Sequence, residues 1–386
     1  MEIEIGIGKT ARRGYGFDDV AIVPSRRTRD PADVEVSWEL DAWRFELPLM
    51  ASAMDAVVSP ATAIEIGRRG GLAVLNLEGL QTRYEDPEPV FDEIAGLSEE
   101  KATRRMQELY REPIKEELVV RRIREIREGG VTAAASLTPQ RVRQYAPLVL
   151  EAELDLLVIQ GTVVSAEHVS TRSEPLNLKE FIARFEIPVV VGGCASYQTA
   201  LHLMRTGAVG VLVGVGPGAA CTTRGVLGVG VPQATAIADA AGARMEHLRE
   251  TGRYVHVIAD GGMRTGGDIA KAIACGADAV MIGSPLSKAY ESPGRGFHWG
   301  MATFHPDLPR GTRVRTRQIG SLEEILVGPA HENDGTLNLF GALRTSMATT
   351  GYDSVKDFQK AEVMVAPALQ TEGKSLQRSQ GVGMGH

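Results

Sequence analysis

We predict that this chain of 386 residues folds as a (β/α)8 TIM barrel, an α/β fold class, on three features of its sequence. Short apolar runs alternate with longer amphipathic segments, which is the rhythm of βα units. The runs are continuously apolar, as expected for strands that are buried on both faces. Eight such runs occur, the number of strands in a closed barrel. An open doubly wound sheet is the alternative, because periodicity does not distinguish the two.

The expected strands occupy residues 47–52, 72–77, 131–137, 154–159, 189–191, 209–213, 255–260 and 279–282. Between them we expect helices, for example over 196–206 and 267–275. Most strand starts in the second half of the chain are separated by the length of one strand and one helix, which supports parallel βα units.

Two stretches interrupt this rhythm. Residues 81–128 are rich in Glu, Arg and Lys at helical spacing, so we expect a helical insertion after strand two whose charges form a solvated face. Residues 285–335 follow strand eight and are rich in Pro, Gly and Arg. A loop of this length is usually functional, so we expect a flap there. We assign 1–370 to a single catalytic barrel and 371–386 to a flexible C-terminal tail.

Composition narrows the class of protein. The net charge is −7, which disfavours a nucleic-acid or anionic-membrane partner. The chain has only three cysteines, Cys194, Cys221 and Cys275, and a small odd number argues against a disulfide framework. The first residues lack the apolar region of a signal peptide, and no apolar run is long enough to span a membrane. We therefore expect a cytoplasmic protein.

The segment with the most chemical content is VGVGPGAACTTRGVLGVGVPQ, residues 213–233. It leaves the sixth expected strand through several glycines and reaches Cys221, at the carboxyl end where barrel active sites form. Thiolates attack electrophilic carbons, so Cys221 is a candidate nucleophile. A lone cysteine is more often a small buried hydrophobe. The glycine loop argues against that reading for Cys221, and we keep it for Cys194 and Cys275.

Two further segments predict a nucleotide site. In the first, a strand ends in Asp260 and is followed by two glycines, and the next strand ends in Gly283 and Ser284. An aspartate accepts hydrogen bonds from ribose hydroxyls, and glycine turns offer backbone N–H groups to a phosphate. Barrel phosphate sites commonly follow strands seven and eight. In the second, PLMASAMDAVVSP, Ser52 and Met54 end the first strand. Met54 either packs against a flat base or fills the core.

These segments together resemble the IMP dehydrogenase and GMP reductase family. The stretches that carry the resemblance are GFDDVAIVPS, SAMDAVVSP, GVGPGAACTTRGVLGVGVPQ, ADGGMRTGGDIAKAIACGADAVMIGS, ESPGRG and LFGALRTSMATTGYDSVKDF. The likeness covers most of 14–366. It implies a barrel, usually a homotetramer, that binds a purine nucleoside monophosphate, NAD and a monovalent cation, K+.

The resemblance also implies roles for particular residues. In IMP dehydrogenases a thiolate adds to C2 of the hypoxanthine, hydride passes to NAD, and water releases XMP. Carried over by position, Cys221 is the nucleophile with Thr223 beside it. The implied nucleotide contacts are Ser52, Met54, Asp260, Gly262, Gly283, Ser284 and His298. The implied NAD contacts are Gln160, Gly214 and Gly216. The implied cation ligands are Gly216, Gly218 and Cys221, with Glu372 and Gly373 from an adjacent subunit.

Several positions depart from the family pattern. The Arg-Tyr pair of the family's mobile flap, which serves hydrolysis, does not occur in 285–335. Gln160 replaces an aspartate, Ala219 replaces a phosphate-binding serine, and His298 replaces a flap tyrosine. Residues 81–128 are too short to be the regulatory CBS pair. We therefore do not name the water-activating residue.

Three functions follow as hypotheses. The first is a short IMP dehydrogenase without CBS domains. The second is a GMP reductase, which converts GMP and NADPH to IMP and ammonia. The third is a catalytically silent protein that binds purine nucleotides. We place IMP dehydrogenase first, because the cysteine loop is intact.

Overall fold

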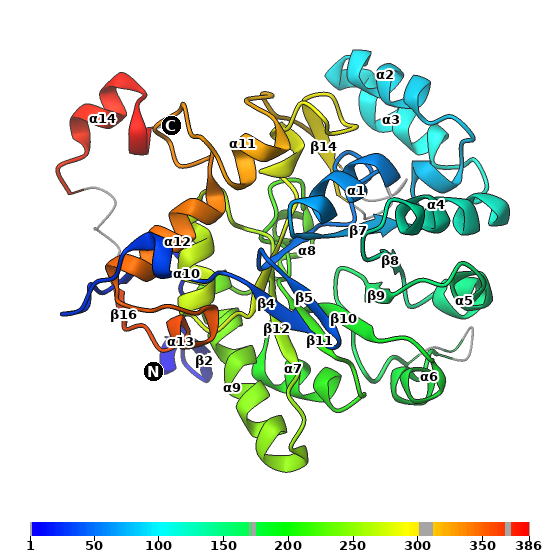
Figure 1. Ribbon diagram of the computed structural model, residues 1–386. Coiled ribbons are helices and arrows are strands. Elements are labelled where there is room, and N and C mark those ends of the chain that lie inside the picture. The colour runs from blue at the N-terminus through cyan, green and yellow to red at the C-terminus, as the bar shows by residue number, and fades with distance from the viewer. Residues whose placement is uncertain (1, 170, 172–174, 301–311, 367–371, 386) are drawn as a thin grey trace.

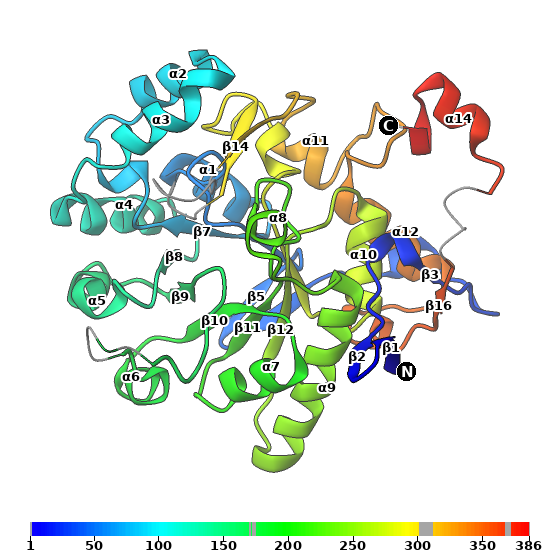
Figure 2. The same cartoon turned by 180° about the vertical axis from the view of Figure 1, so that it is seen from behind.

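The computed structural model describes residues 2–169, 171, 175–300, 312–366 and 372–385. Its centre is a closed barrel of eight parallel strands in chain order, in which the last strand pairs with the first (Figures 1 and 2). The strands are β6 (Leu49–Ala51), β7 (Leu72–Asn76), β8 (Ala134–Leu137), β9 (Leu156–Gln160), β10 (Val189–Cys194), β11 (Gly210–Val213), β12 (His256–Asp260) and β13 (Ala279–Ile282). This confirms the predicted fold class and all eight predicted strands.

The strands read as continuous apolar runs because both of their faces are buried. Met50, Val158 and Leu212 belong to a cluster inside the barrel, whereas their neighbours along each strand pack outward against helices. The hairpin of β4 (Trp38–Leu40) and β5 (Trp43–Phe45) contributes Trp38, Leu40 and Phe45 to the same inner cluster. The Trp38 ring also meets His256, at the start of β12, so this hairpin covers the amino end of the barrel. The opposite, carboxyl end carries the loops.

A helix follows each strand and packs on the outside of the barrel (Figure 1). These helices are α1 (Pro60–Arg68), α4 (Glu116–Glu128), α5 (Val142–Glu151), α6 (Leu178–Arg184), α7 (Tyr197–Met204), α9 (Gln233–Thr251), α10 (Gly266–Ala274) and α12 (Leu339–Thr349). Serine and threonine caps define where several of them begin: the side chains of Ser196 and Thr265 accept hydrogen bonds from the first turns of α7 and α10. The helices predicted over 196–206 and 267–275 are therefore confirmed.

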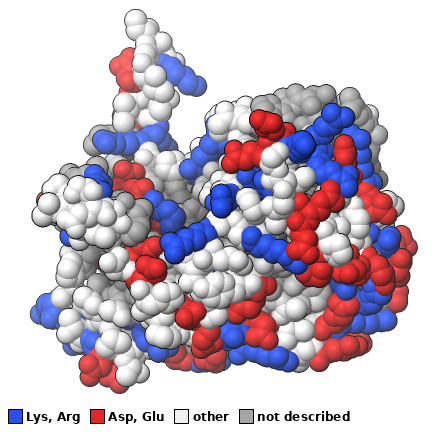
Figure 3. Space-filling view, turned by 90° about the horizontal axis from the view of Figure 1, so that it is seen from above, with Lys and Arg blue, Asp and Glu red and all other residues white. Residues whose placement is uncertain are grey.

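The stretch 81–128 forms helices, as expected. After η3 (Leu80–Thr82) come α2 (Glu88–Gly96) and α3 (Glu99–Leu109), and then α4 returns to the barrel wall. Its charges are mostly paired on the surface, for example Arg105 with Glu93 and Glu108. Figure 3 shows acidic and basic side chains interleaved on the right-hand side, where these helices lie in Figure 1.

The stretch 285–335 contains regular elements. They are η4 (Leu286–Lys288), a hairpin of β14 (Phe297–Trp299) and β15 (Arg313–Arg315), and α11 (Leu322–Leu326). Two side chains of this stretch that could act as a base, Arg310 and His305, lie outside the described residues. The helix α14 (Ser375–Gln380) forms within the segment that we predicted to be a flexible tail, and it buries none of its residues.

The remaining elements bring the two ends of the chain onto the barrel wall. The strand β3 (Val20–Ile22) pairs with β16 (Val363–Val365). The others are β1 (Glu2–Gly6), β2 (Lys9–Arg12), η1 (Phe17–Asp19), η2 (Pro31–Asp33), α8 (Thr223–Leu227), α13 (Val355–Phe358) and η5 (Gly383–Gly385). Within the described part of the chain, every helix is too short or too polar to cross a membrane.

Candidate active site

The cysteine loop leaves the carboxyl end of β11 and holds an exposed thiol. The Cys221 backbone N–H donates to the Gly218 carbonyl at 3.0 Å, which closes a tight turn directly before α8. The Cys221 Sγ lies 3.2 Å from the Oγ1 of the buried Thr223. Of the three cysteines, Cys221 is the one that is exposed to solvent. The loop therefore presents an exposed thiol at the carboxyl face of the barrel, and its role as a nucleophile stays a prediction.

The other two cysteines have the inert surroundings that we expected. Burial raises the pKa of Cys194 to about 12. Burial also raises the pKa of Cys275 to about 11, although Lys271 lowers it slightly. Because the thiolate is the reactive form, neither thiol is a nucleophile near neutral pH.

The cysteine loop is fastened to the end of β12. The side-chain amide of Gln233 donates to the carbonyls of Val213, at 2.7 Å, and Asp260, at 3.1 Å. A Cβ atom on Gly214 would lie 2.1 Å from the Asp260 carbonyl oxygen, so only glycine permits this approach. Gln233 was part of the segment singled out in the sequence, but its anchoring role is not visible there, because it joins positions that are far apart in the chain.

Asp260 ends β12 beside this loop. Glycines at 261 and 262 follow it, with φ angles of +79° and +83°, and pack against Pro217 of the cysteine loop. Burial raises the pKa of Asp260 to about 7, and a hydrogen bond from Gln160 partly opposes the increase. The Nε2 of Gln160 lies 3.2 Å from the Asp260 Oδ2. The two residues that we assigned to the cofactor and to the ribose are thus in direct contact.

Gln160 also carries an unused acceptor. Its Oε1 is buried and has no hydrogen-bond partner among the described residues. A buried acceptor without a donor is unfavourable, so a ligand hydroxyl or amide that donates to it would be stabilised. This atom fits the expected contact with a nicotinamide nucleotide.

The expected phosphate and base contacts lie together at the ends of β6 and β13. A Cβ on Gly283 would be 2.4 Å from the Met54 Sδ and 3.4 Å from the Ser52 Cβ, so these side chains cover the glycine closely. Ser284 Oγ is hydrogen-bonded to the His298 Nε2 at 2.8 Å. The structure therefore brings together the four strand-end residues and His298.

Burial determines the charge of His298. Its side chain is fully buried, and desolvation, aided by the positive charge of Lys288, lowers its pKa to about 4. The imidazole is therefore neutral at pH 7, and it would contact a phosphate as a hydrogen-bond donor and not as a cation.

Thr316 is a neighbour of this group that the sequence did not reveal. Its hydroxyl lies 3.3 Å from the Ser287 Oγ, which in turn donates to the Ser284 carbonyl at 2.8 Å. Thr316 follows β15, and no motif marks it. Only the pairing of the flap hairpin brings it beside the turn after β13.

The expected cation ligands are only partly together within one chain. Gly216, Gly218 and Cys221 share one loop, and Gly216 has a φ angle of +78°, which turns successive carbonyls in different directions. Glu372 and Gly373 directly precede α14, which Figures 1 and 2 place at the periphery, away from α8. Their contribution from an adjacent subunit stays a prediction. No cluster of three or more His, Cys, Asp or Glu side chains in the described residues could hold a metal ion.

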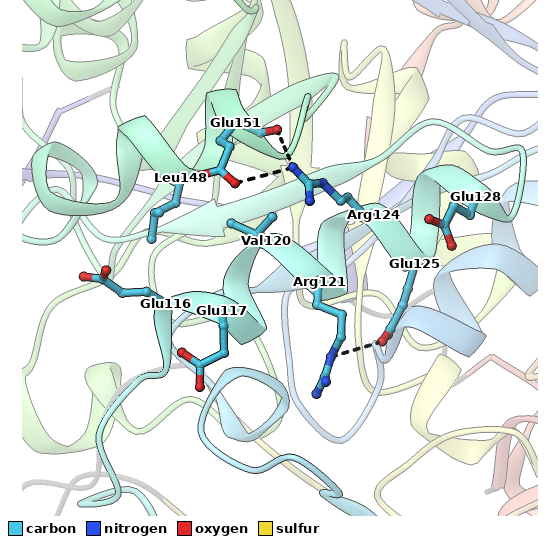
Figure 4. Close-up of a pocket in the computed structure, with 9 residues that line it drawn as sticks. All are labelled: Glu116, Glu117, Val120, Arg121, Arg124, Glu125, Glu128, Leu148 and Glu151. Carbon is cyan, nitrogen blue, oxygen red and sulfur yellow. Dashed lines mark hydrogen bonds and ion pairs between the residues drawn. The ribbon is translucent and has the colours of Figure 1, made fainter.

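A separate groove of about 500 Å³ lies between α4 and α5 on the outer wall (Figure 4). Glu125 and Glu151 are paired there with Arg121, at 3.7 Å, and Arg124, at 3.5 Å. It contains none of the predicted site residues, and we assign it to the solvated face of the insertion.

Comparison with known proteins identifies the same family that the sequence motifs resemble. Residues 14–305 match the model of the IMP dehydrogenase / GMP reductase domain. An uncharacterized oxidoreductase of Mycolicibacterium smegmatis is 51% identical over 372 residues, which are 94% of this chain and 99% of that protein. The inosine-5'-monophosphate dehydrogenase of Borreliella burgdorferi is 31% identical over 74% of this chain and 72% of its own length.

A solved structure is similar over nearly the whole chain. It is the crystal structure of an IMP dehydrogenase/GMP reductase-like protein from Corynebacterium glutamicum, with 47% sequence identity and a TM-score of 0.90. The similarity covers 94% of this chain and 97% of that one.

Proposed function

This chain belongs to the IMP dehydrogenase and GMP reductase family, and we propose that within it the chain is an NAD-dependent IMP dehydrogenase of guanine nucleotide biosynthesis. The reaction would oxidise inosine 5'-monophosphate to xanthosine 5'-monophosphate. The observation that carries the proposal is the exposed Cys221 thiol, on a loop tied by Gln233 to the strand that ends in Asp260. We also propose that the enzyme acts in the cytoplasm as a homotetramer.

In this proposal, residues at the carboxyl ends of the barrel strands bind the nucleotide. The ionised Asp260 accepts hydrogen bonds from the ribose hydroxyls. Backbone N–H groups at Gly262 and Gly283 and the Ser284 hydroxyl donate to the phosphate, while the Nε2–H of the neutral His298 donates to the Ser284 oxygen and orients that hydroxyl. Met54, whose sulfur covers Gly283, and Ser52 beside it line the base. Held at both ends, the purine has its C2 atom facing the cysteine loop.

The chemistry proceeds through the sulfur. The Cys221 thiolate adds to C2 of the hypoxanthine and forms a tetrahedral carbon. The Thr223 hydroxyl, 3.2 Å from the sulfur, can donate to the thiolate before attack. Gln160, Gly214 and Gly216 would hold NAD, which would supply the oxidant for the hydride that leaves C2. Water then attacks the C2–S intermediate, the C–S bond breaks, and XMP and the free thiol are released.

The residues present suit the two expected accessory groups. Gln160, with its unpartnered Oε1, would hold a donor of the nicotinamide nucleotide. Gly214 and Gly216 are the other residues that we assign to that cofactor, on the loop beside it. Carbonyls of Gly216, Gly218 and Cys221 would hold K+, which fixes the shape of the loop that aims the thiol.

A GMP reductase is the second candidate, and one observation favours it. The Arg-Tyr pair that the family uses for hydrolysis is missing from 285–335. Reductive removal of ammonia from GMP by NADPH needs no hydrolytic water, so the loss would not impair it.

The experiment is a paired assay of the purified full-length chain, in which the absorbance of reduced nicotinamide is followed. IMP plus NAD, with K+ present, should produce reduced cofactor and XMP. GMP plus NADPH should show no consumption. The opposite result would assign the reductase reaction, and nucleotide binding without turnover of either pair would leave a silent binding protein.

A further inference from the structure

Three buried hydrogen-bonding side chains link separate parts of the carboxyl face. Asp55 directly follows Met54 in the loop after β6, Tyr110 directly follows α3 of the insertion, and Trp299 is the last residue of β14. The Tyr110 hydroxyl donates to the Asp55 Oδ2 at 2.5 Å and accepts from the Trp299 Nε1 at 2.7 Å. Asp55 is 2% exposed and Trp299 is 1% exposed. One phenol therefore joins the insertion, the flap hairpin and the first active-site loop.

An apolar cluster surrounds these hydrogen bonds. Its fully or largely buried members come from the same three parts: Ala56, Leu80, Val90, Phe91, Ile94, Met106, Leu109 and Trp299. Figures 1 and 2 both show α2 and α3 beside β14 and α1. Because these groups are buried, and the Asp55 Oδ1 already has no hydrogen-bond partner among the described residues, loss of the Tyr110 hydroxyl would leave the Asp55 Oδ2 and the Trp299 N–H unpaired at a cost.

Two arginines of the flap hairpin fix it to the insertion. Arg295 forms ion pairs with Glu88, at 2.8 Å, and Asp92, at 2.6 Å, both on α2. Arg313 donates to the Leu97 carbonyl at 2.7 Å. The base of the flap is therefore held against α2 from outside, while Tyr110 holds it from inside.

Both ends of the network are next to proposed nucleotide contacts. Asp55 is bonded through the chain to Met54, which covers Gly283, and Trp299 is bonded to His298, which contacts Ser284. We propose that Tyr110 is a positioning residue for nucleotide binding, which holds the Met54 turn and the His298 strand at a fixed separation. This inference rests on the proposed function, because it uses the nucleotide site assigned there. It gives the helical insertion a role in substrate affinity.

The test compares two tyrosine-to-phenylalanine variants of the insertion. Tyr110→Phe removes the hydroxyl that joins Asp55 and Trp299. Tyr84→Phe is the matched control, since its hydroxyl donates only to the Leu109 backbone carbonyl, at 2.9 Å, in the same cluster. Calorimetric titration with IMP and steady-state kinetics give Kd, KM and kcat for each.

Loss of a buried hydrogen bond to a charged group should raise the Kd and KM for IMP of Tyr110→Phe about tenfold, with kcat within about threefold of the parent. Tyr84→Phe should stay within about twofold of the parent in all three constants. Equal losses in both variants, unchanged IMP affinity in Tyr110→Phe, or a loss confined to kcat would overturn the positioning role.

A second variant covers the case in which Tyr110→Phe does not fold. Trp299→Phe keeps an aromatic ring against Phe91 but removes the N–H that reaches Tyr110. It should also weaken IMP binding more than Tyr84→Phe does, and unchanged affinity would refute the link. If the parent itself binds no purine nucleotide, the proposed function fails and the positioning role fails with it. If the parent binds IMP normally and these variants do too, only the positioning role is lost.

Discussion

Replacing Asp260 by asparagine should stabilise the unliganded protein and weaken IMP binding. Burial raises the pKa of Asp260 to about 7 from an ordinary value of 3.8. At about 1.4 kcal/mol for each pH unit, this difference is an upper limit of about 4 kcal/mol for keeping the carboxylate ionised in the folded chain. Because the residue is partly exposed to solvent, we expect about 1–3 kcal/mol.

The sign of the pH dependence follows from which state ionises first. In the unfolded chain the carboxyl group loses its proton near its ordinary pKa of 3.8, whereas in the folded chain it does so near 7. Parent stability therefore falls as the pH rises between these two values and is level above them. Asp260→Asn lacks this loss, so the two proteins should be equally stable at low pH and the variant more stable at pH 8.

Nucleotide binding should change in the opposite direction. Ribose hydroxyls donate to the ionised carboxylate, so parent affinity for IMP should rise through pH 7. Asp260→Asn should bind IMP about a hundredfold more weakly at pH 8, since two charge-assisted hydrogen bonds are weakened. The nucleotide phosphate titrates identically with both proteins, so the ratio of their Kd values isolates the carboxylate.

Urea unfolding without ligand at several pH values, and calorimetric titration with IMP at the same values, measure both effects. Asp33→Asn removes an exposed carboxylate on η2 and controls for the change in net charge. A variant less stable than the parent at pH 8 would show that burial does not oppose ionisation of Asp260. A Kd ratio that is constant across pH 7 would show that this carboxylate does not hold the ribose.

Three other substitutions test the thiol, the nucleotide cradle and the barrel wall. Cys221→Ala should abolish turnover and leave the Kd for IMP nearly unchanged, as measured by kinetics and titration. Gly283→Ala should weaken IMP binding and lower stability by about 1–3 kcal/mol, because its Cβ would lie 2.4 Å from the Met54 Sδ. Arg244→Met should lower the free energy of unfolding by about 1–3 kcal/mol, because the buried Asp278 loses the guanidinium 2.7 Å away and keeps only the more distant Lys356, at 3.7 Å.

Matched variants make these outcomes specific. Cys275→Ala should retain turnover, since that thiol is half-buried and desolvation raises its pKa. Gly267→Ala should not destabilise the chain, because the nearest atom to its Cβ is the Thr265 Oγ1 at 3.7 Å. Normal turnover by Cys221→Ala would refute covalent catalysis. IMP binding by Gly283→Ala as tight as that of the parent would show that Gly283 does not contact the phosphate. An unchanged urea-unfolding midpoint for Arg244→Met would mean that the buried ion pair contributes no net stability.

The barrel strands could be predicted because each is apolar on both faces. The strand boundaries are less predictable, because backbone pairing and turns set them and hydrophobicity does not. The fifth strand extends to Cys194, beyond the expected Val191, because Gly192 and Gly193 carry no hydrophobic signal although Gly192 and Cys194 still pair with β11. Strand three begins at Ala134, later than expected, since the residues before it belong to the turn that leaves α4.

The site residues could be predicted where the signal is local. Asp260 and Ser284 each end an apolar run, so the barrel topology alone places them on one face. The contact between Gln160 and Asp260 spans a hundred residues, and the Tyr110 hydroxyl meets Asp55 only because the insertion folds back over the barrel. Such contacts depend on tertiary packing, which leaves no periodic trace in the sequence.

Two described side chains of the flap, those of Arg313 and His298, have contacts that do not suit a base for water. Arg313 donates to backbone carbonyls of the insertion and stacks 4.2 Å from the centre of the Phe297 ring. Desolvation lowers its pKa, but its guanidinium is already engaged by these contacts. His298 is bonded to Ser284, and its pKa of about 4 makes it a weak base at pH 7. In the proposed IMP dehydrogenase reaction, Arg313 and His298 are therefore poorly suited to activate water, and His298 would instead hold the Ser284 hydroxyl toward the nucleotide.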